Sequence, residues 1–415
     1  MFLYRILTNL LLPIISLYML FRLYKKKENI TSVLHKFTIR QDKLPNKDII
    51  WFHAASVGEV NIVIPLVKKI VNERADLHCL VTTVTQTSAK IFKSSKIKNT
   101  THQFLPLDIV FIINNFLNHW KPKVAIFIES EFWPNIIHQT TQNIPILLFN
   151  GRFSDASYKR WRRYKKFIST LLRKFALILP ASNIDYKRFS HFTKNNLKFI
   201  GNFKYAVPTL SYSREYVALL EQKLKNKSVF VAASTHNEEE SILFRVHKKV
   251  KKRIPNLFTI IIPRHPNRIN AIKSDAQQHQ INYIENINDC KKDTDMFLVS
   301  ELGILGNFFH FAKIVFIGGS LVDIGGHNIL EPAKLDTAII MGPYFSNFTE
   351  IVSAFEKKEA ICIVKNIRDF EDKLYNLFQN LEYRKKLIFN AKNISRKHDN
   401  ISQIAIKYIY NYLCK

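Results

Sequence analysis

The chain has 415 residues, of which 47% are hydrophobic and 13% aromatic, so it is a folded protein rather than a disordered one and is long enough for two domains. Its formal net charge of +29 predicts a polyanionic partner: nucleic acid, an anionic membrane surface or a phosphorylated substrate. Four cysteines lie far apart without a C-x-x-C pair, which argues against a disulfide framework or a structural zinc site and fits a reducing compartment.

The N-terminal segment, residues 2–24, is the candidate membrane anchor. Between Arg5 and Arg22 it is uncharged and mostly apolar, but it is shorter than the roughly 20 residues of a full span. Lys25-Lys26-Lys27 follows without a cleavage site, and this positive cluster predicts that the rest of the chain stays in the cytoplasm. We therefore expect residues 1–30 to form a tilted or shallow anchor; a helix docked on the protein is the alternative.

From residue 49 onward, short apolar runs alternate with helical stretches. Strands are predicted at 49–54, 77–84, 124–128, 146–149 and 175–179 and, after a break near 201–213, at 229–233, 257–262, 296–299, 314–317 and 338–341. This alternation predicts two doubly wound parallel α/β domains, residues 31–207 and 208–397, with a ligand cleft facing the carboxyl ends of both sets of strands. A terminal helix is expected at 398–415, with an apolar face formed by Ile401, Ile404, Ala405, Tyr408 and Tyr412.

Two acidic segments follow predicted strands of the first domain. Ser56-Val57-Gly58-Glu59 places Glu59 in the first turn of a helix, where a carboxylate can act as a general base and the helix N-terminus would keep it ionised. Capping of that helix is the structural alternative. Glu129 and Glu131 flank Ser130 after another strand; either one faces the cleft and the other caps, or Glu131 caps and Glu129 pairs with a lysine.

A glycine-rich segment, 318–332, follows the strand at 314–317. Its glycines permit sharp turns and close approach of the backbone to a ligand. Asn328 is placed to cap a helix through Leu335, leaving free N–H groups for a ligand, and Glu331 in its first turn can accept hydrogen bonds from a sugar. The segment therefore predicts a nucleotide or nucleotide-sugar site, or else a structural turn with Glu331 favouring the helix dipole.

Other strand ends of the second domain carry polar residues as well. Arg264, with Pro263 before it, is a fork suited to phosphate, and Ser300-Glu301-Leu302 ends the next strand. Such strand ends predict a nucleotide pocket. In the first domain, residues 158–167 (YKRWRRYKKF) interleave basic and aromatic side chains, which suits a phosphorylated amphiphile at a membrane, nucleic acid, or merely a solvated helix.

Together these motifs resemble the 3-deoxy-D-manno-octulosonic acid (Kdo) transferases of lipopolysaccharide and lipid A biosynthesis. The resemblance is carried, in chain order, by HAASVGE at 53–59, ESEFWPN at 129–135, NGRFSDAS at 150–157, GNFKY at 201–205, PRHPNR at 263–268 and GGSLVDIGGHNILEPA at 318–333. It implies a GT-B glycosyltransferase fold, with two Rossmann-like domains facing a central cleft and an N-terminal membrane-anchor helix. It also implies transfer of Kdo from CMP-Kdo to the lipid A precursor (lipid IVA), with inversion, on the cytoplasmic side of the inner membrane.

The resemblance further implies roles for individual residues. Glu59 resembles the family's general base, and Glu129 and Lys204 its transition-state-stabilising pair. The positions that resemble its CMP-binding residues are Pro263, Arg264, Ser300, Glu301, Leu302, Asn328, Ile329, Leu330 and Glu331. Ser300 departs from the family pattern, which has Gly there.

Cofactors and partners follow from the same resemblance. We expect no cofactor and no metal, because arginine, lysine and helix amides can bind the single phosphate of CMP. The expected partners are CMP-Kdo, the lipid A precursor and the anionic inner-membrane surface, and not nucleic acid. Two alternatives stay open: a GT-B transferase with another nucleotide-sugar, and a non-catalytic protein that binds anionic lipid or nucleic acid through its charge.

Overall fold

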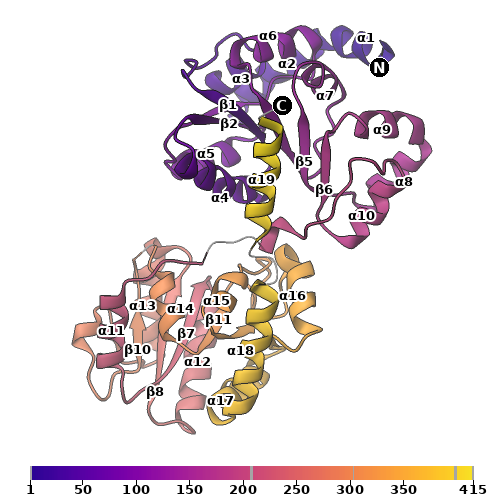
Figure 1. The fold of residues 1–415 in the computed structure, drawn as a ribbon. Coiled ribbons are helices and arrows are strands. Elements are labelled where there is room, and N and C mark those ends of the chain that lie inside the picture. The colour runs from indigo at the N-terminus through magenta and orange to yellow at the C-terminus, as the bar shows by residue number, and fades with distance from the viewer. Residues whose placement is uncertain (1, 206–208, 302, 397–399, 414–415) are drawn as a thin grey trace. The chain divides into compact units, whose positions relative to one another are not determined.

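The computed structural model describes residues 2–205, 209–301, 303–396 and 400–413. The chain forms two compact units (Figure 1), unit 1 from residues 1–206 and 398–415 and unit 2 from residues 207–397. Each unit is built on one parallel sheet with helices packed against it. The predicted Leu302 position lies outside the described residues.

The sheet of unit 1 has six strands in the order β3-β2-β1-β4-β5-β6, and every neighbouring pair is parallel. Its strands are β1 (Asp48–His53), β2 (Leu77–Thr83), β3 (Thr100–Phe104), β4 (Val124–Ile128), β5 (Ile146–Gly151) and β6 (Leu177–Pro180). Five of these coincide with predicted strands, whereas β3 was not expected because its sequence, TTHQF, is largely polar. The first strand, β1, lies inside the sheet rather than at its edge.

Helices connect these strands and flank them. They are α1 (Phe2–Leu10), α2 (Leu12–Tyr24), α3 (Ile30–Lys36), α4 (Val57–Glu73), α5 (Gln86–Ser94), α6 (Val110–Trp120), α7 (Pro134–Thr140), α8 (Asp155–Arg163), α9 (Lys165–Leu172), α10 (Asn183–Ser190), the 3₁₀ turn η1 (Phe203–Tyr205) and α19 (Ile401–Leu413). Among the described residues, no single helix has the length and hydropathy of a membrane span. Tyr4–Leu10 and Leu12–Tyr24 meet them only as a pair, bent by 51°.

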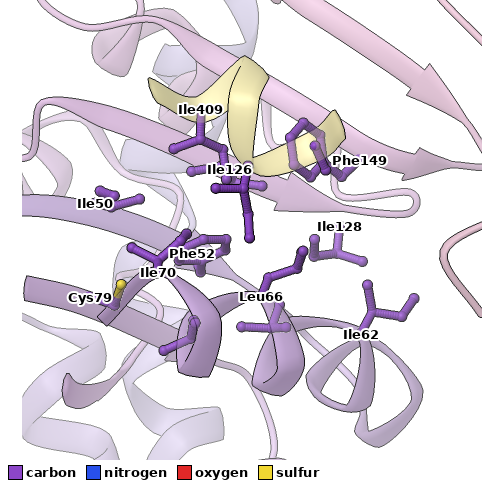
Figure 2. Close-up of a cluster of buried hydrophobic side chains, with 14 of the residues drawn as sticks. Ile50, Phe52, Ile62, Leu66, Ile70, Cys79, Ile126, Ile128, Phe149 and Ile409 are labelled. Carbon is purple, nitrogen blue, oxygen red and sulfur yellow. The ribbon is translucent and has the colours of Figure 1, made fainter. Parts of the chain in front are cut away.

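Alternate side chains of β1 enter two separate hydrophobic cores. Ile50 and Phe52 pack with α4 and α19 in the cluster of Figure 2, while Ile49 and Trp51 belong to a second cluster with α6, α7 and α9. Because successive side chains of a strand point to opposite faces, this division places helices on both faces of the sheet. Burial on both faces explains why the strand reads as a continuous apolar run.

The C-terminal helix α19 returns to unit 1 after the chain has passed through unit 2. It buries Ile401, Ala405, Ile406 and Ile409 against the core of Figure 2. The predicted apolar face was therefore partly wrong: Ile404 is 39% exposed, and Ile406 and Ile409 lie inward instead. Helical spacing is compatible with more than one face when a helix is apolar nearly all round.

The sheet of unit 2 has seven strands in the order β13-β12-β11-β7-β8-β10-β9, again all parallel. They are β7 (Ser228–Thr235), β8 (Leu257–Pro263), β9 (Tyr283–Ile284), β10 (Met296–Leu298), β11 (Ile314–Ile317), β12 (Ala338–Met341) and β13 (Cys362–Ile363). The two-residue strands β9 and β13 lie at the sheet edges and were not predicted, because two residues carry no periodicity. The remaining five strands were predicted.

The helices of unit 2 complete a second α/β unit. They are α11 (Arg214–Lys223), α12 (Glu239–Lys251), η2 (Pro266–Arg268), α13 (Ile269–Gln278), η3 (Ile287–Asp289), α14 (Leu305–Phe311), α15 (Leu330–Lys334), η4 (Ser346–Phe348), α16 (Thr349–Glu356), α17 (Ile367–Gln379) and α18 (Leu381–Arg396). Two parallel Rossmann-like sheets in one chain give the α/β architecture that the alternating pattern predicted.

Candidate functional site

The order of the strands identifies one favourable place for a site in unit 1. From β1 the chain builds β2 and β3 on one side, and it then crosses to β4, β5 and β6 on the other. In an open parallel sheet, ligands bind beyond the carboxyl ends of the strands at such a reversal. Glu59 follows β1, and Glu129 and Glu131 follow β4, so the structure brings all three carboxylates to this point.

Glu59 is fixed at the start of α4 by a reciprocal set of hydrogen bonds. Ser56 caps the helix by accepting the Glu59 N–H, and the Glu59 carboxylate accepts the Ala55 N–H (2.8 Å) and the Ser56 hydroxyl (2.8 Å). The residue is only 6% exposed. Burial raises the pKa of Glu59 to about 7, with the charge of Glu131 adding to the rise and the Ser56 hydrogen bond opposing it. Burial therefore outweighs the helix N-terminus, which we had expected to keep Glu59 ionised.

Glu131 is paired with a histidine of β1. Its Oε2 lies 3.2 Å from Nε2 of His53 and accepts the indole N–H of Trp133 at 2.6 Å. Burial opposes ionisation of Glu131, but the hydrogen bond and charge of His53, together with the Trp133 N–H, lower its pKa overall. Glu131 thus stays anionic beside Glu59, whose own pKa is raised.

Glu129 belongs to a second network at the end of β4. Its backbone has a φ of 61°, and the buried Asn150 at the end of β5 has a φ of 55°; both values are unusual for residues other than glycine. The Asn150 amide donates to Glu129 (3.3 Å) and accepts the N–H of Phe203 (3.3 Å). Lys204 follows Phe203 in η1, so Asn150 connects the segments that carry Glu129 and Lys204.

Unit 2 has an equivalent reversal between β7 and β11. Here the glycine-rich loop is held by a carboxylate of the protein itself. Glu239, fully buried at the start of α12, accepts the N–H groups of His236 (2.9 Å), Gly319 (2.7 Å), Ser320 (2.9 Å) and Leu321 (2.9 Å). Gly318 lies close to the end of β7, and only glycine fits there, because a Cβ would lie 2.3 Å from the Ser234 carbonyl oxygen.

The second half of the glycine-rich segment differs from its predicted form. The helix runs from Leu330 to Lys334, starting after Asn328 and ending before Leu335. Asn328 accepts the Leu330 N–H (3.0 Å) and donates to Glu331 (3.2 Å). Of the N–H groups expected to be free in this turn, that of Leu330 is thus occupied by Asn328. Ile329 and Leu330 are fully buried, so neither residue exposes its side chain to a ligand.

Basic side chains gather at this edge of unit 2. The Nε2 atoms of His236 and His327 lie 2.7 Å apart, and the His236 ring also packs against that of His265. Burial is the main cause that lowers the pKa of His327, to about 4, and the charges of His236 and Arg264 add to it. Arg264 is exposed, and its N–H is anchored on the Thr235 carbonyl (3.0 Å).

The remaining predicted positions divide into two groups. Pro263 ends β8, and Arg264 follows it. Burial raises the pKa of Glu331, while the hydrogen bond from Asn328 and the charge of Arg264 oppose the rise. Ser300 and Glu301 are exposed after β10, and the charge of Glu301 acts on Tyr216 of α11. The structure therefore brings Arg264 together with Glu331, while Glu301 lies near α11.

Comparison with known proteins decides the family. The family model described as 3-deoxy-D-manno-octulosonic-acid transferase (kdotransferase) matches residues 28–207. The 3-deoxy-D-manno-octulosonic acid transferase of Rickettsia bellii is 37% identical over 98% of this chain and 95% of its own length. The enzyme of the same name from Haemophilus influenzae is 32% identical over 82% of each chain. This chain belongs to the Kdo transferase family.

Solved structures support the fold of this Kdo transferase. A glycosyltransferase from Rickettsia africae matches 89% of this chain and 100% of its own with a TM-score of 0.52, at 15% identity. That likeness concerns the fold alone, and it confirms the predicted GT-B architecture with its two Rossmann-like sheets. The family predicted from the motifs is confirmed as well.

Three features of the site were missed from the sequence of this Kdo transferase. They are the His53–Glu131 pair, the Asn150 bridge and the Glu239 carboxylate under the glycine-rich loop. His53 and Asn150 stand inside the motifs HAASVGE and NGRFSDAS, but no spacing along the chain showed their partners. Glu239 lies 80 residues before Gly319, and only the neighbouring positions of β7 and β11 bring them together.

Proposed function

We propose that this enzyme transfers Kdo from CMP-Kdo to a hydroxyl of the lipid A precursor, with inversion, and that Glu59 is the general base. The observation that carries the proposal is the state of Glu59 at the strand reversal of unit 1. Its carboxylate is oriented by two hydrogen bonds and has a pKa raised to about 7 by burial. A general base works best when its pKa lies near the operating pH.

The chemistry is a single displacement. Glu59 takes the proton of the acceptor hydroxyl while the hydroxyl oxygen attacks the anomeric carbon of Kdo. At the same time, the bond from that carbon to the CMP phosphate oxygen breaks. Attack on the face opposite the leaving group inverts the anomeric centre. Glu129 and Lys204, in the segments that Asn150 connects, are proposed to stabilise the charge that develops during transfer.

Unit 2 is proposed to hold the donor. Arg264 is exposed at the edge of the sheet, with its backbone anchored, and offers a charged fork to the single phosphate of CMP. Asn328 and Glu331 supply amide and carboxyl groups for the nucleotide or sugar hydroxyls, and the peptide groups of Ile329 and Leu330 lie between them. Pro263, Ser300 and Glu301 are proposed to line the same pocket.

The acceptor is proposed to be met at the inner membrane, with both units on the cytoplasmic side. Helices α1 and α2, with the residue between them, expose a series of large apolar side chains: Ile6, Leu7, Leu10, Leu11, Ile14, Leu17, Tyr18, Leu20, Phe21 and Tyr24. The net charge of +29 favours an anionic surface. An anchor of this kind brings the enzyme to a substrate that is itself embedded in the bilayer.

The test is transfer from CMP-Kdo to a tetra-acylated lipid A precursor, followed by mass spectrometry. Glu59→Gln should lower the rate by roughly 10²–10⁴-fold, as expected for a lost general base. Glu215→Gln is the matched control, because Glu215 is also in the first turn of a helix but is exposed on α11. Full activity of Glu59→Gln would refute the base; transfer from a UDP-sugar in place of CMP-Kdo would refute the donor.

A further inference from the structure

Helix α1 has its polar side chains against the protein and its apolar side chains facing outward. Tyr4, Arg5 and Thr8 are partly buried and hydrogen-bonded to unit 1, whereas Leu7 is 52% exposed and Leu10 is 70% exposed. A surface helix of a soluble protein has the opposite arrangement, because both the burial of apolar side chains and the hydration of polar ones are favourable. The reversed arrangement indicates that the medium outside α1 is apolar.

The contacts of α1 with unit 1 are hydrogen bonds to residues before and within α7. They are Tyr4 donating to Asp108 (2.8 Å), Arg5 donating to Gln139 (3.2 Å) and the Asn135 amide donating to Thr8 (3.2 Å). Asp108 also accepts the backbone N–H groups of Asn135 (3.3 Å) and Ile136 (2.7 Å), so one carboxylate joins α1 to the start of α7. Because α7 begins at Pro134, α1 is connected to the segment that carries Glu131.

The far end of α2 is fixed on unit 1 as well. Arg22 pairs with Glu28 (3.2 Å), and Glu28, which is only 5% exposed, also pairs with Lys36 of α3 (2.6 Å). The Lys36 carbonyl in turn accepts the N–H of Leu107, between β3 and α6, at 2.9 Å. Residues 4–22 are therefore held to the same unit at both of their ends.

This double attachment decides between crossing a bilayer and lying on it. Length alone would permit a crossing, because helical residues rise about 1.5 Å each and the two helices together reach roughly the 30 Å of a hydrocarbon core. A crossing, however, places the two ends of a segment on opposite sides of the bilayer. Since Tyr4 and Arg22 both connect to unit 1, they lie on the same side.

The outward surface continues along α2 and suits the boundary between headgroups and acyl chains. Ile14 is 62% exposed and Leu17 is 67% exposed. The Ser16 hydroxyl donates to the Leu12 carbonyl within the helix (2.9 Å), which removes a polar group that would otherwise be costly in lipid. Asn9, next to the bend between α1 and α2, is exposed, and its amide fits the hydrated headgroup region rather than the centre of a bilayer.

The charge next to this surface identifies the kind of lipid. Lys25, Lys26 and Lys27 follow α2 directly, and all three are exposed. Lysines at the edge of an apolar helical surface are attracted to anionic headgroups, while the apolar side chains enter the acyl region. The apolar and basic parts of the segment therefore complement the same partner.

We propose that α1 and α2 form an in-plane binding surface for an anionic phospholipid bilayer, and that residues 4–22 enter one leaflet without crossing to the other. The inference rests on the proposed function for the membrane location of the enzyme. It adds the orientation of the anchor, with α1 held on unit 1 through Asp108 and Asn135.

The position of residue 1 relative to the membrane tests the orientation in the full-length enzyme. A protease-cleavable tag is placed before Met1, and a second tag after Lys415 reports the side of unit 1. In cells whose outer membrane has been removed, added protease should leave both tags intact, and in inverted inner-membrane vesicles it should remove both. Removal of the first tag from the intact cells, with the second tag protected, would overturn the in-plane orientation and leave the membrane location standing.

Flotation with vesicles tests the surface itself and uses no sugar substrate. The enzyme should bind vesicles of phosphatidylethanolamine and phosphatidylglycerol more tightly than vesicles of phosphatidylcholine alone. Ile14→Asn should weaken binding roughly tenfold, because one apolar side chain no longer enters the acyl region. Phe389→Asn is the matched control: Phe389 on α18 is 64% exposed, against 62% for Ile14, and its substitution should leave binding unchanged.

The outcomes of flotation separate this inference from the proposed function. Equal binding by Ile14→Asn and the wild type would overturn the surface formed by α1 and α2, while the membrane location would stand. Equal binding to both kinds of vesicle would overturn the anionic partner. A wild-type enzyme that binds neither kind would overturn the surface together with the proposed membrane location.

Discussion

Lowering the pH from 8 to 6 should slow Kdo transfer roughly tenfold. Burial raises the pKa of Glu59 to about 7, so Glu59 is ionised in about nine-tenths of the enzyme molecules at pH 8 and in about one-tenth at pH 6. Only the ionised form can act as the base. A carboxyl with its usual pKa would stay almost fully ionised across this range, and the rate would barely change. The size of the fall therefore reports the burial of Glu59 directly.

The assay is the initial rate of transfer from CMP-Kdo at low substrate, which gives kcat/KM for the free enzyme. Ser56→Ala provides a variant with a predicted direction. The Ser56 hydroxyl donates to the Glu59 carboxylate and lowers its pKa, so removing that hydroxyl should move the acid limb of the profile to higher pH. Glu215→Gln should leave the limb in place.

Two results would refute this reasoning. A rate that stays flat from about pH 8 to pH 5.5 would mean that Glu59 is either ionised throughout or not the base. A Ser56→Ala profile that moved to lower pH would show that the hydroxyl does not stabilise the carboxylate. A general loss of rate without a shift would indicate only that the cap of α4 matters for folding or orientation.

Three further predictions concern stability. The folded-state pKa of Glu59 lies above its unfolded value, so the contribution of Glu59 to stability is complete below about pH 4.5 and is lost as the pH rises through about 7. In urea unfolding, the wild type should lose roughly 3 kcal/mol relative to Glu59→Gln between these limits. A difference that does not change with pH would contradict this prediction. Glu239→Gln should lower the free energy of unfolding by roughly 2–5 kcal/mol, because an amide cannot accept all four backbone N–H groups. CMP binding, measured by calorimetry, should also weaken, because the glycine-rich loop loses hydrogen bonds that hold it. Unchanged stability would refute the role of the carboxylate in holding the loop. Ile409→Ala should lower the free energy of unfolding by about 2–5 kcal/mol in the same urea experiment, whereas Ile404→Ala, on the exposed side of the same helix, should lower it by less than about 1 kcal/mol. Equal losses would mean that α19 does not pack as described.

The sequence predicted the inner strands of both sheets because their residues are buried on two faces. The β1 run, Ile49 to Phe52, is apolar without interruption for this reason. The sequence could not predict β3, because β3 is a strand through its pairing with β2 and its own residues are largely polar. The sequence also could not predict that α19 packs on unit 1, because an amphipathic pattern does not specify which sheet a helix covers.

For the site, the sequence located the acids but not their surroundings. Glu59, Glu129 and Glu131 were found because they stand at strand ends, where a parallel sheet collects polar groups. The pairing of His53 with Glu131 spans 78 residues and depends on β1 and β4 being neighbours, which no spacing shows. The raised pKa of Glu59 was missed for the same reason, since it depends on burial and on the nearby Glu131.

The two units place a buried carboxylate at the same structural position, and comparing them explains why we propose only one of the two as a general base. Glu59 and Glu239 each stand in the first turn of the helix after the first strand of their sheet, beside the strand reversal. A carboxylate can accept about four hydrogen bonds. Glu239 receives four backbone N–H groups and has no capacity left for a substrate.

Glu59 receives two hydrogen bonds, from Ala55 and Ser56, which orient it and leave lone pairs free to accept the proton of a hydroxyl. The difference also fits their environments, because Glu239 is fully buried and Glu59 retains 6% exposure. At equivalent positions of two similar sheets, the number of donors already bound distinguishes a carboxylate that holds a loop from one that can act as a base.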